Sequence, residues 1–158
     1  MLKPAVLLNF LLVQRGFVIR YLIFAGLLNL VWEVLHLPLY TLWQDRSGHE
    51  ISFAVVHCTM GDVLIAFFSL VASLLMVGKN EWPKKRYLTV ALTALLFGVG
   101  YTVFSEWNNT VVTRSWAYSA LMPQMWGIGL SPVAQWIVIP SVTFWHLLKK
   151  VDRQSARP

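Results

Sequence analysis

The chain of 158 residues has little charge. Only 13% of its residues are Asp, Glu, Lys or Arg, while 57% are hydrophobic and the mean hydropathy is +0.59. Soluble domains carry about 25% charged residues, so this deficit excludes a soluble globular domain and also a disordered chain. Cysteine is scarce too, because Cys58 stands alone and cannot form an internal disulfide. We therefore expect an integral membrane protein with a single transmembrane domain over residues 1–158.

Several motifs of common enzymes are also missing. The sequence contains no Gly-rich phosphate loop, no nucleophile elbow, no C-x-x-C and no H-E-x-x-H. Any functional signal must therefore come from polar residues placed within apolar segments.

Four apolar segments are long enough to cross a bilayer, which takes about 20 residues. They are 21–40, 52–77, 88–106 and 130–148. They predict an all-α integral membrane protein built as a four-helix transmembrane bundle. The apolar stretch 4–13 is shorter, and it predicts either a short N-terminal interfacial helix or an extension of the first span.

The basic residues predict the orientation of these spans. Of the 13 Lys and Arg residues, only Arg46 and Arg114 fall in the loops 41–51 and 107–129. Since cytoplasmic loops carry the excess of Lys and Arg, both termini should be cytoplasmic and these two loops should lie outside, in the periplasm or the extracellular space. The net charge of +6 thus reflects topology and contact with membrane lipids, and we expect no nucleic-acid partner.

Ionisable residues gather in the outer halves of the predicted spans, where burial in lipid makes each of them costly. Glu33 and His36 are three residues apart in the first span and share a helix face. His57 and Asp62 lie in the second span, and Glu106 ends the third. We expect them to converge on one cavity open to the outside, with Glu33, His57, Asp62 and Glu106 as candidate catalytic residues.

One interpretation of these residues is a metal site. Glu33, His36, His57 and Asp62 are the candidate ligands of a divalent metal such as zinc, iron or manganese. A di-iron bundle needs two E-x-x-H motifs and the chain has one. Haem between His36 and His57 is disfavoured because carboxyl groups would surround an apolar macrocycle. A structural alternative pairs Glu33 with His57 and Asp62 with Thr59 or a backbone group.

The second interpretation is acid–base chemistry without a metal. A carboxyl group in hydrocarbon is stable in its protonated form, and it can protonate a double bond or an epoxide while a nearby Asp or His takes a proton back. A lipophilic substrate, such as an isoprenoid, would enter between the helices. This interpretation predicts a small intramembrane isomerase, cyclase or hydrolase.

The predicted outer loop 107–129 is long and rich in Trp, Tyr and Met. It forms either an interfacial aromatic belt or a lid over the cavity. Arg114 is its basic residue, which we expect to pair with Glu106 or to hold an anionic headgroup. The candidate substrate-binding residues are Trp107, Asn109, Arg114, Trp116 and Tyr118, together with Gln135 of the fourth span.

Two further functions stay open. One is a metal- or haem-binding accessory or structural subunit, acting as an oligomer or within a larger membrane complex. The other is a proton or cation transporter, which an intramembrane carboxylate often marks. The inner halves of the spans offer only weakly polar candidates for an ion path, so transport by a monomer is disfavoured.

Overall fold

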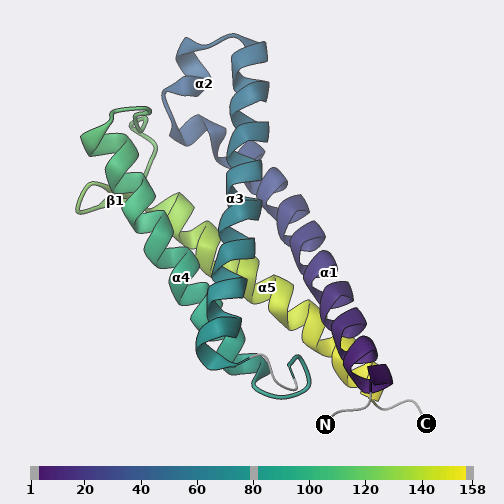
Figure 1. The fold of residues 1–158 in the computed structure, drawn as a ribbon. Coiled ribbons are helices and arrows are strands. Elements are labelled where there is room, and N and C mark those ends of the chain that lie inside the picture. Colours follow the sequence, from purple (N-terminus) through teal and green to yellow (C-terminus); the bar gives the residue numbers. More distant parts are fainter. Residues whose placement is uncertain (1–3, 79–81, 156–158) are drawn as a thin grey trace.

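The computed structural model describes residues 4–78 and 82–155. It is mostly helical (80%) and is drawn in Figure 1. Its elements are α1 (Pro4–His36), the 3₁₀ turn η1 (Leu37–Leu39), α2 (Leu42–Asp45), α3 (Gly48–Val77), α4 (Tyr87–Trp107), the π-helical turn η2 (Asn108–Val112), β1 (Gln124–Met125), β2 (Ile128–Gly129) and α5 (Leu130–Ser155).

Three helical segments in the described residues are long and apolar enough to cross a membrane. They are Gln14–Leu39, Gly48–Val77 and Tyr87–Val112, with mean hydropathies of 1.7, 2.2 and 1.8. The fourth predicted span, 130–148, coincides with α5 but does not reach the same apolar content. Its helix contains Gln135, two prolines, Ser, Thr and His, which lower its hydropathy.

The first helix differs from the predicted span at both ends. Residues 4–13 continue directly into it, so α1 is one helix of 33 residues and has no separate interfacial helix before it. At the other end α1 stops at His36, although the predicted span ran to residue 40, and η1 follows. Pro38 explains this end, because proline disfavours the α conformation in the residue before it and lacks an N–H donor.

The third helix is also longer than predicted. After α4, the turn η2 carries the helical path to Val112, so Trp107 and Asn109 lie on helical backbone and not in a loop. The side-chain amide of Asn109 donates to the Ser105 carbonyl over 2.9 Å, and the Thr110 hydroxyl donates to the Glu106 carbonyl over 2.7 Å. The irregular segment between α4 and α5 therefore begins at Thr113.

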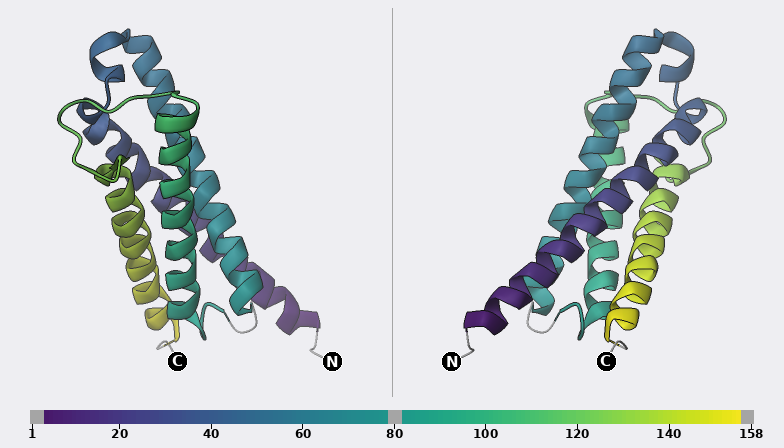
Figure 2. Two further views of the ribbon diagram at one scale, coloured as in Figure 1. Left: turned by 90° about the vertical axis from the view of Figure 1, so that its left-hand side faces the viewer. Right: turned by 90° about the vertical axis from the view of Figure 1, so that its right-hand side faces the viewer.

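The four long helices pack in a closed ring. α3 packs against α1 and α4, and α5 packs against α4 and α1. Figure 2 shows α1 running obliquely across the other three helices. We call the end at which α1 and α4 finish and α3 and α5 begin the α2 end, because α2 lies there (Figure 1).

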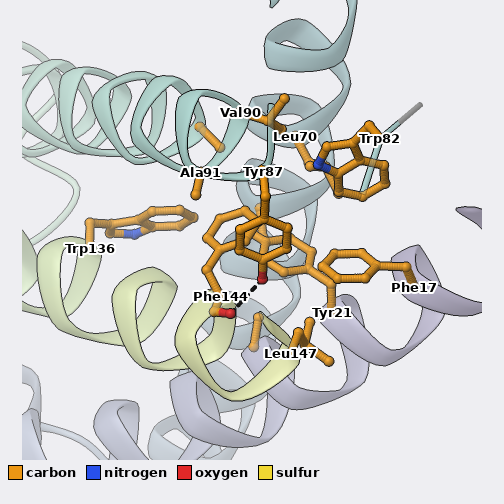
Figure 3. Close-up of a cluster of buried hydrophobic side chains, with 13 residues drawn as sticks. Phe17, Tyr21, Leu70, Trp82, Tyr87, Val90, Ala91, Trp136, Phe144 and Leu147 are labelled. Atoms are coloured by element: carbon orange, nitrogen blue, oxygen red, sulfur yellow. Dashed lines mark hydrogen bonds between the residues drawn. The ribbon is translucent and has the colours of Figure 1, made fainter. Parts of the chain in front are cut away.

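A cluster of aromatic side chains fills the ring at the end opposite α2 (Figure 3). The rings of Phe17 and Trp82 lie 4.6 Å apart, and those of Tyr21 and Phe144 lie 4.9 Å apart. The Tyr87 hydroxyl donates a hydrogen bond to the Phe144 carbonyl. This contact satisfies the hydroxyl and joins α4 to α5 within the apolar core.

The outward faces of the helices are strongly apolar. Leu35, Leu75 and Leu96 are each at least 69% exposed, and many other large hydrophobic side chains are also exposed. Soluble monomers rarely expose contiguous apolar surface on this scale. Exposed apolar faces of this kind are expected of helices that contact an apolar environment such as lipid.

Candidate functional site

A cavity of about 890 Å³ lies among the helices. Its walls come from α1, α3, α4 and α5, and η2 and residues 115–116 close part of its α2 end. The lining includes the four predicted catalytic residues, one predicted metal ligand besides them, and three of the predicted substrate-binding residues. These are Glu33, His57, Asp62, Glu106, His36, Asn109, Trp116 and Gln135.

Gln135 of α5 is the centre of the polar network beside this cavity. Its side chain is almost fully buried, and its Nε2 lies 2.8 Å from Asn29 Oδ1, 3.0 Å from Glu33 Oε1 and 3.0 Å from Asp62 Oδ2. An amide nitrogen carries two hydrogens, so three acceptors compete for two donors. The side-chain amide of Gln135 on α5 therefore contacts side chains from both α1 and α3.

Glu33 and Asp62 form a buried carboxyl pair. Both are 8% exposed, and because the two oxygens contact the same nitrogen, they lie no further apart than twice the 3.0 Å that separates each from it. Two ionised carboxylates at such a distance repel strongly where water is scarce. A single proton held by the pair removes this repulsion.

Neighbouring side chains hold the pair in place. Trp136 Nε1 donates to Asp62 Oδ1 over 3.3 Å, and Asn29 Nδ2 donates to the Ala25 carbonyl over 2.9 Å, which leaves the Asn29 oxygen for Gln135. Trp136 occupies the space over Gly98, where a Cβ atom would come within 2.3 Å of the indole ring. Glycine at position 98 is thus required for the observed position of Trp136.

His36 connects Glu33 to α5. Its Nε2 lies 3.1 Å from Glu33 Oε2, and its Nδ1 lies 3.1 Å from the Ser131 hydroxyl. Trp32 Nε1 donates to the same hydroxyl over 3.3 Å. The predicted shared face of Glu33 and His36 is therefore present, and both ring nitrogens of His36 have partners.

Glu106 forms a second carboxyl site nearer the α2 end. Tyr118 donates to Glu106 Oε2 over 2.5 Å and Tyr40 donates to the same oxygen over 3.5 Å, while the Gly129 amide donates to the Tyr118 hydroxyl over 2.9 Å. Burial and the hydrogen bond to Glu106 raise the pKa of Tyr118. The phenol therefore stays protonated and remains a donor at neutral pH.

The segment after η2 folds back onto η1. Tyr118 forms a β-bridge with Tyr40, the Ser119 amide donates to the Leu39 carbonyl over 2.9 Å, and the Thr41 amide donates to the Ala117 carbonyl over 3.0 Å. The Ser119 hydroxyl also donates to the Pro38 carbonyl over 2.8 Å. Residues 117–119 are thus tied to the α2 end, and Tyr118 reaches Glu106 from there.

Three predicted site residues are exposed and lie apart from these networks. His57 is exposed at the edge of the cavity, with its ring stacked 5.8 Å from that of Phe53. Trp107 is 47% exposed and Arg114 is also exposed, and neither is among the described residues that line the cavity. The polar partners of Glu106 are tyrosines, so the expected pairing with Arg114 is not found in the described part of the chain.

The structural pairing considered from the sequence is also wrong. Glu33 contacts His36 and Gln135 instead of His57. Asp62 contacts Gln135 and Trp136 instead of Thr59. The long-range partners on α5 could not be read from the spacing of residues within α1 or α3.

The arrangement of donors does not resemble a metal centre. Among the side chains that the structure describes, no three His, Cys, Asp or Glu residues are close enough together to hold a metal ion. Of the predicted ligands Glu33, His36, His57 and Asp62, the histidines point to different partners and the Gln135 amide bridges the carboxyl groups. An amide nitrogen is a hydrogen-bond donor and not a metal ligand.

The candidates predicted from the sequence did not include several residues of the site, among them Trp136 and Tyr40. Aromatic residues are common in membrane helices, so residue type alone does not mark these two as partners of carboxyl groups. Tryptophan and tyrosine need a partner for the N–H or O–H when buried, and the nearby carboxyl groups meet that need.

No protein-family model, no curated protein and no solved structure matches this chain.

Proposed function

We propose that this chain is a membrane-embedded enzyme that performs acid–base chemistry on a lipophilic substrate. The observation that carries the proposal is the Glu33–Asp62 pair: two buried carboxyl groups, bridged by Gln135, line a large cavity between apolar helices. A large, mostly apolar pocket with a few converging polar groups is typical of catalytic sites.

In this proposal α5 crosses the membrane together with α1, α3 and α4. It packs against both α1 and α4. Its polar residues Gln135 and Thr143 are buried inside the ring, while Ile137 and Trp145 face outward. Two of the polar residues that lower the hydropathy of α5 are thus shielded from lipid, which supports a four-helix transmembrane bundle.

The proposed orientation places the α2 end outside. Arg20, Lys84 and Lys149 lie toward the opposite end, whereas Arg46 and Arg114 lie toward the α2 end. By the positive-inside rule, the α2 end of the cavity, where Glu106 lies, then faces the outside. Labelling of single Cys residues at Ser47 and Lys85, in a Cys58→Ser background, checks this: position 47 should react from outside and position 85 should not.

The proposed chemistry needs no further reactant. The protonated carboxyl group of the pair transfers its proton to a carbon of the substrate, so an O–H bond breaks and a C–H bond forms. The carboxylate that remains then removes a proton from a neighbouring carbon. The pair finishes as it began, which suits an isomerase or a cyclase.

Deuterium exchange tests this proposal without knowledge of the product. The purified protein in nanodiscs is incubated in D₂O with a neutral-lipid extract of its native membrane, and carbon-bound deuterium is measured by mass spectrometry. We expect at least one lipid to gain deuterium with the wild type. Glu33→Gln and Asp62→Asn should slow this gain by about 10²–10⁴-fold, the usual effect of losing a general acid.

Glu50→Gln is the matched control, because it makes the same change at an exposed carboxyl group outside the large cavity. Glutamine also preserves the capping box that Glu50 forms with Ser47 at the start of α3. Equal exchange by all four proteins, or none by the wild type, contradicts the proposal and favours an accessory-subunit role.

A further inference from the structure

The cavity is elongated along α3. Its α3 wall extends from Phe53 to Ala72, a distance of about 28 Å at about 1.5 Å per residue. The hydrocarbon core of a bilayer is about 30 Å thick. The shape therefore fits an extended lipid chain better than a compact small molecule.

The wall of the cavity is also part of the outer surface of the bundle. Leu64 and Phe68 of α3 and Phe97 and Tyr101 of α4 line the cavity and are between 40% and 62% exposed. The cavity is therefore open to the apolar surroundings of the helices along the exposed faces of α3 and α4. A lipid can enter it sideways from the bilayer.

The charged residues that line the cavity limit the charge of the ligand that can bind there. Among the described residues that line the cavity there is no Lys or Arg, while Glu33, Asp62 and Glu106 supply three carboxyl groups. A phosphate or diphosphate headgroup would lack the cationic partners that usually bind it and would lie beside carboxyl groups. The ligand that fits this lining is uncharged.

The carboxyl pair lies about halfway along the cavity. Asp62 is close to the midpoint of the wall between Phe53 and Ala72. The reacting atoms of a bound chain are thus in its interior and not at its end. Trp136 and Tyr101 also line the cavity, and aromatic faces stabilise a nearby positive charge.

We propose that the substrate is an uncharged, elongated, unsaturated lipid that enters between α3 and α4 and is protonated at a carbon–carbon double bond near the middle of its bound length. This inference rests on the proposed acid–base function. The carboxyl O–H bond breaks, the π electrons of the double bond form the new C–H bond, and a carbocation results. Loss of an adjacent proton to the carboxylate restores neutrality and shifts the double bond.

Binding of two matched probes tests the substrate class separately from turnover. Geranylgeraniol and geranylgeranyl phosphate share one unsaturated chain and differ in charge. Native mass spectrometry of the protein released from nanodiscs measures the fraction bound to each. We expect geranylgeraniol to bind at least tenfold more tightly than geranylgeranyl phosphate.

Two glycines provide a matched pair of variants for the cavity. A Cβ atom at Gly61 or at Gly100 meets no other atom within 4 Å, but Gly61 lines the cavity and Gly100 does not. Gly61→Trp should fill the middle of the cavity and reduce geranylgeraniol binding at least tenfold, and Gly100→Trp should leave it unchanged.

The outcomes separate this inference from the proposed function. Equal binding of the two probes, or unchanged binding by Gly61→Trp, overturns the substrate class even if deuterium exchange persists. Selective binding of geranylgeraniol without deuterium exchange on any native lipid keeps the uncharged-lipid site and overturns the acid–base function. Deuterium found only at a chain end contradicts protonation in the interior of the chain.

Discussion

The two ends of this bundle use the same four helices for different purposes. At the end opposite α2, Tyr21, Tyr87 and Phe144 pack ring against ring, and the buried Tyr87 hydroxyl is satisfied by one carbonyl. From the α2 end as far as Ala72 of α3, the helices leave a cavity beside this core, and Glu33 and Asp62 are buried there. Tight apolar packing stabilises a bundle, whereas buried carboxyl groups beside empty space do not. This contrast suggests that the aromatic end supplies the stability that the polar end lacks.

The largest expected effect separates the chemistry from the fold. Asp62→Asn keeps the size of the side chain and one oxygen that can accept from Trp136, but it removes the acidic proton. We expect deuterium exchange to fall by about 10²–10⁴-fold, with the free energy of unfolding changed by less than about 1 kcal/mol. Deuterium exchange and chemical denaturation in detergent, measured on the wild type and on the variant, check both expectations. If Glu33→Gln instead lowers the free energy of unfolding and also removes a co-purifying metal, the result points to metal ligation.

The converse change at the aromatic end should affect stability alone. Phe144→Ala removes a ring that contacts Tyr21 and Tyr87, and we expect it to lower the free energy of unfolding by about 3–5 kcal/mol. The protein that remains folded should bind geranylgeraniol as the wild type does. If geranylgeraniol binding falls while the free energy of unfolding is unchanged, the aromatic end takes part in binding and the two ends do not have separate roles.

A change at Gly98 tests how closely the polar site depends on packing. Gly98→Leu forces the Trp136 ring away from α4, since even a Cβ atom would lie 2.3 Å from it. We expect a loss of about 1–3 kcal/mol in the free energy of unfolding and slower deuterium exchange, because Trp136 holds Asp62. Gly100→Leu is the control, as a Cβ atom there meets open space.

The smallest expected effect is the difference between the two tyrosine contacts of Glu106. Tyr118→Phe removes the 2.5 Å hydrogen bond to Glu106, and we expect a loss of about 1.5–3 kcal/mol. Tyr40→Phe removes the 3.5 Å contact and should cost less than about 1 kcal/mol. Thermal unfolding of the two variants side by side measures the difference. A larger loss from Tyr40→Phe would contradict the hydrogen-bond geometry.

Helical spacing allowed part of the site to be predicted. Residues three apart share a face, so the contact between Glu33 and His36 follows from the sequence. His57 and Asp62 are five apart, which places them about 140° from each other around a helix. α3 is an uninterrupted helix, and it buries Asp62 while exposing His57. A single strongly apolar helix cannot direct both residues into the same network.

The sequence by itself determined the helical class, the membrane-spanning length and composition that the structure shows for three of the four predicted spans, and the side chains that would be costly to bury. Those properties depend on composition and on neighbours along one helix. Only the tertiary structure decided that Gln135 of α5 joins Asn29, Glu33 and Asp62, and that Tyr118 reaches Glu106. These contacts depend on how the helices rotate and cross, which packing between distant segments sets. The position and the lining of the cavity follow from that packing.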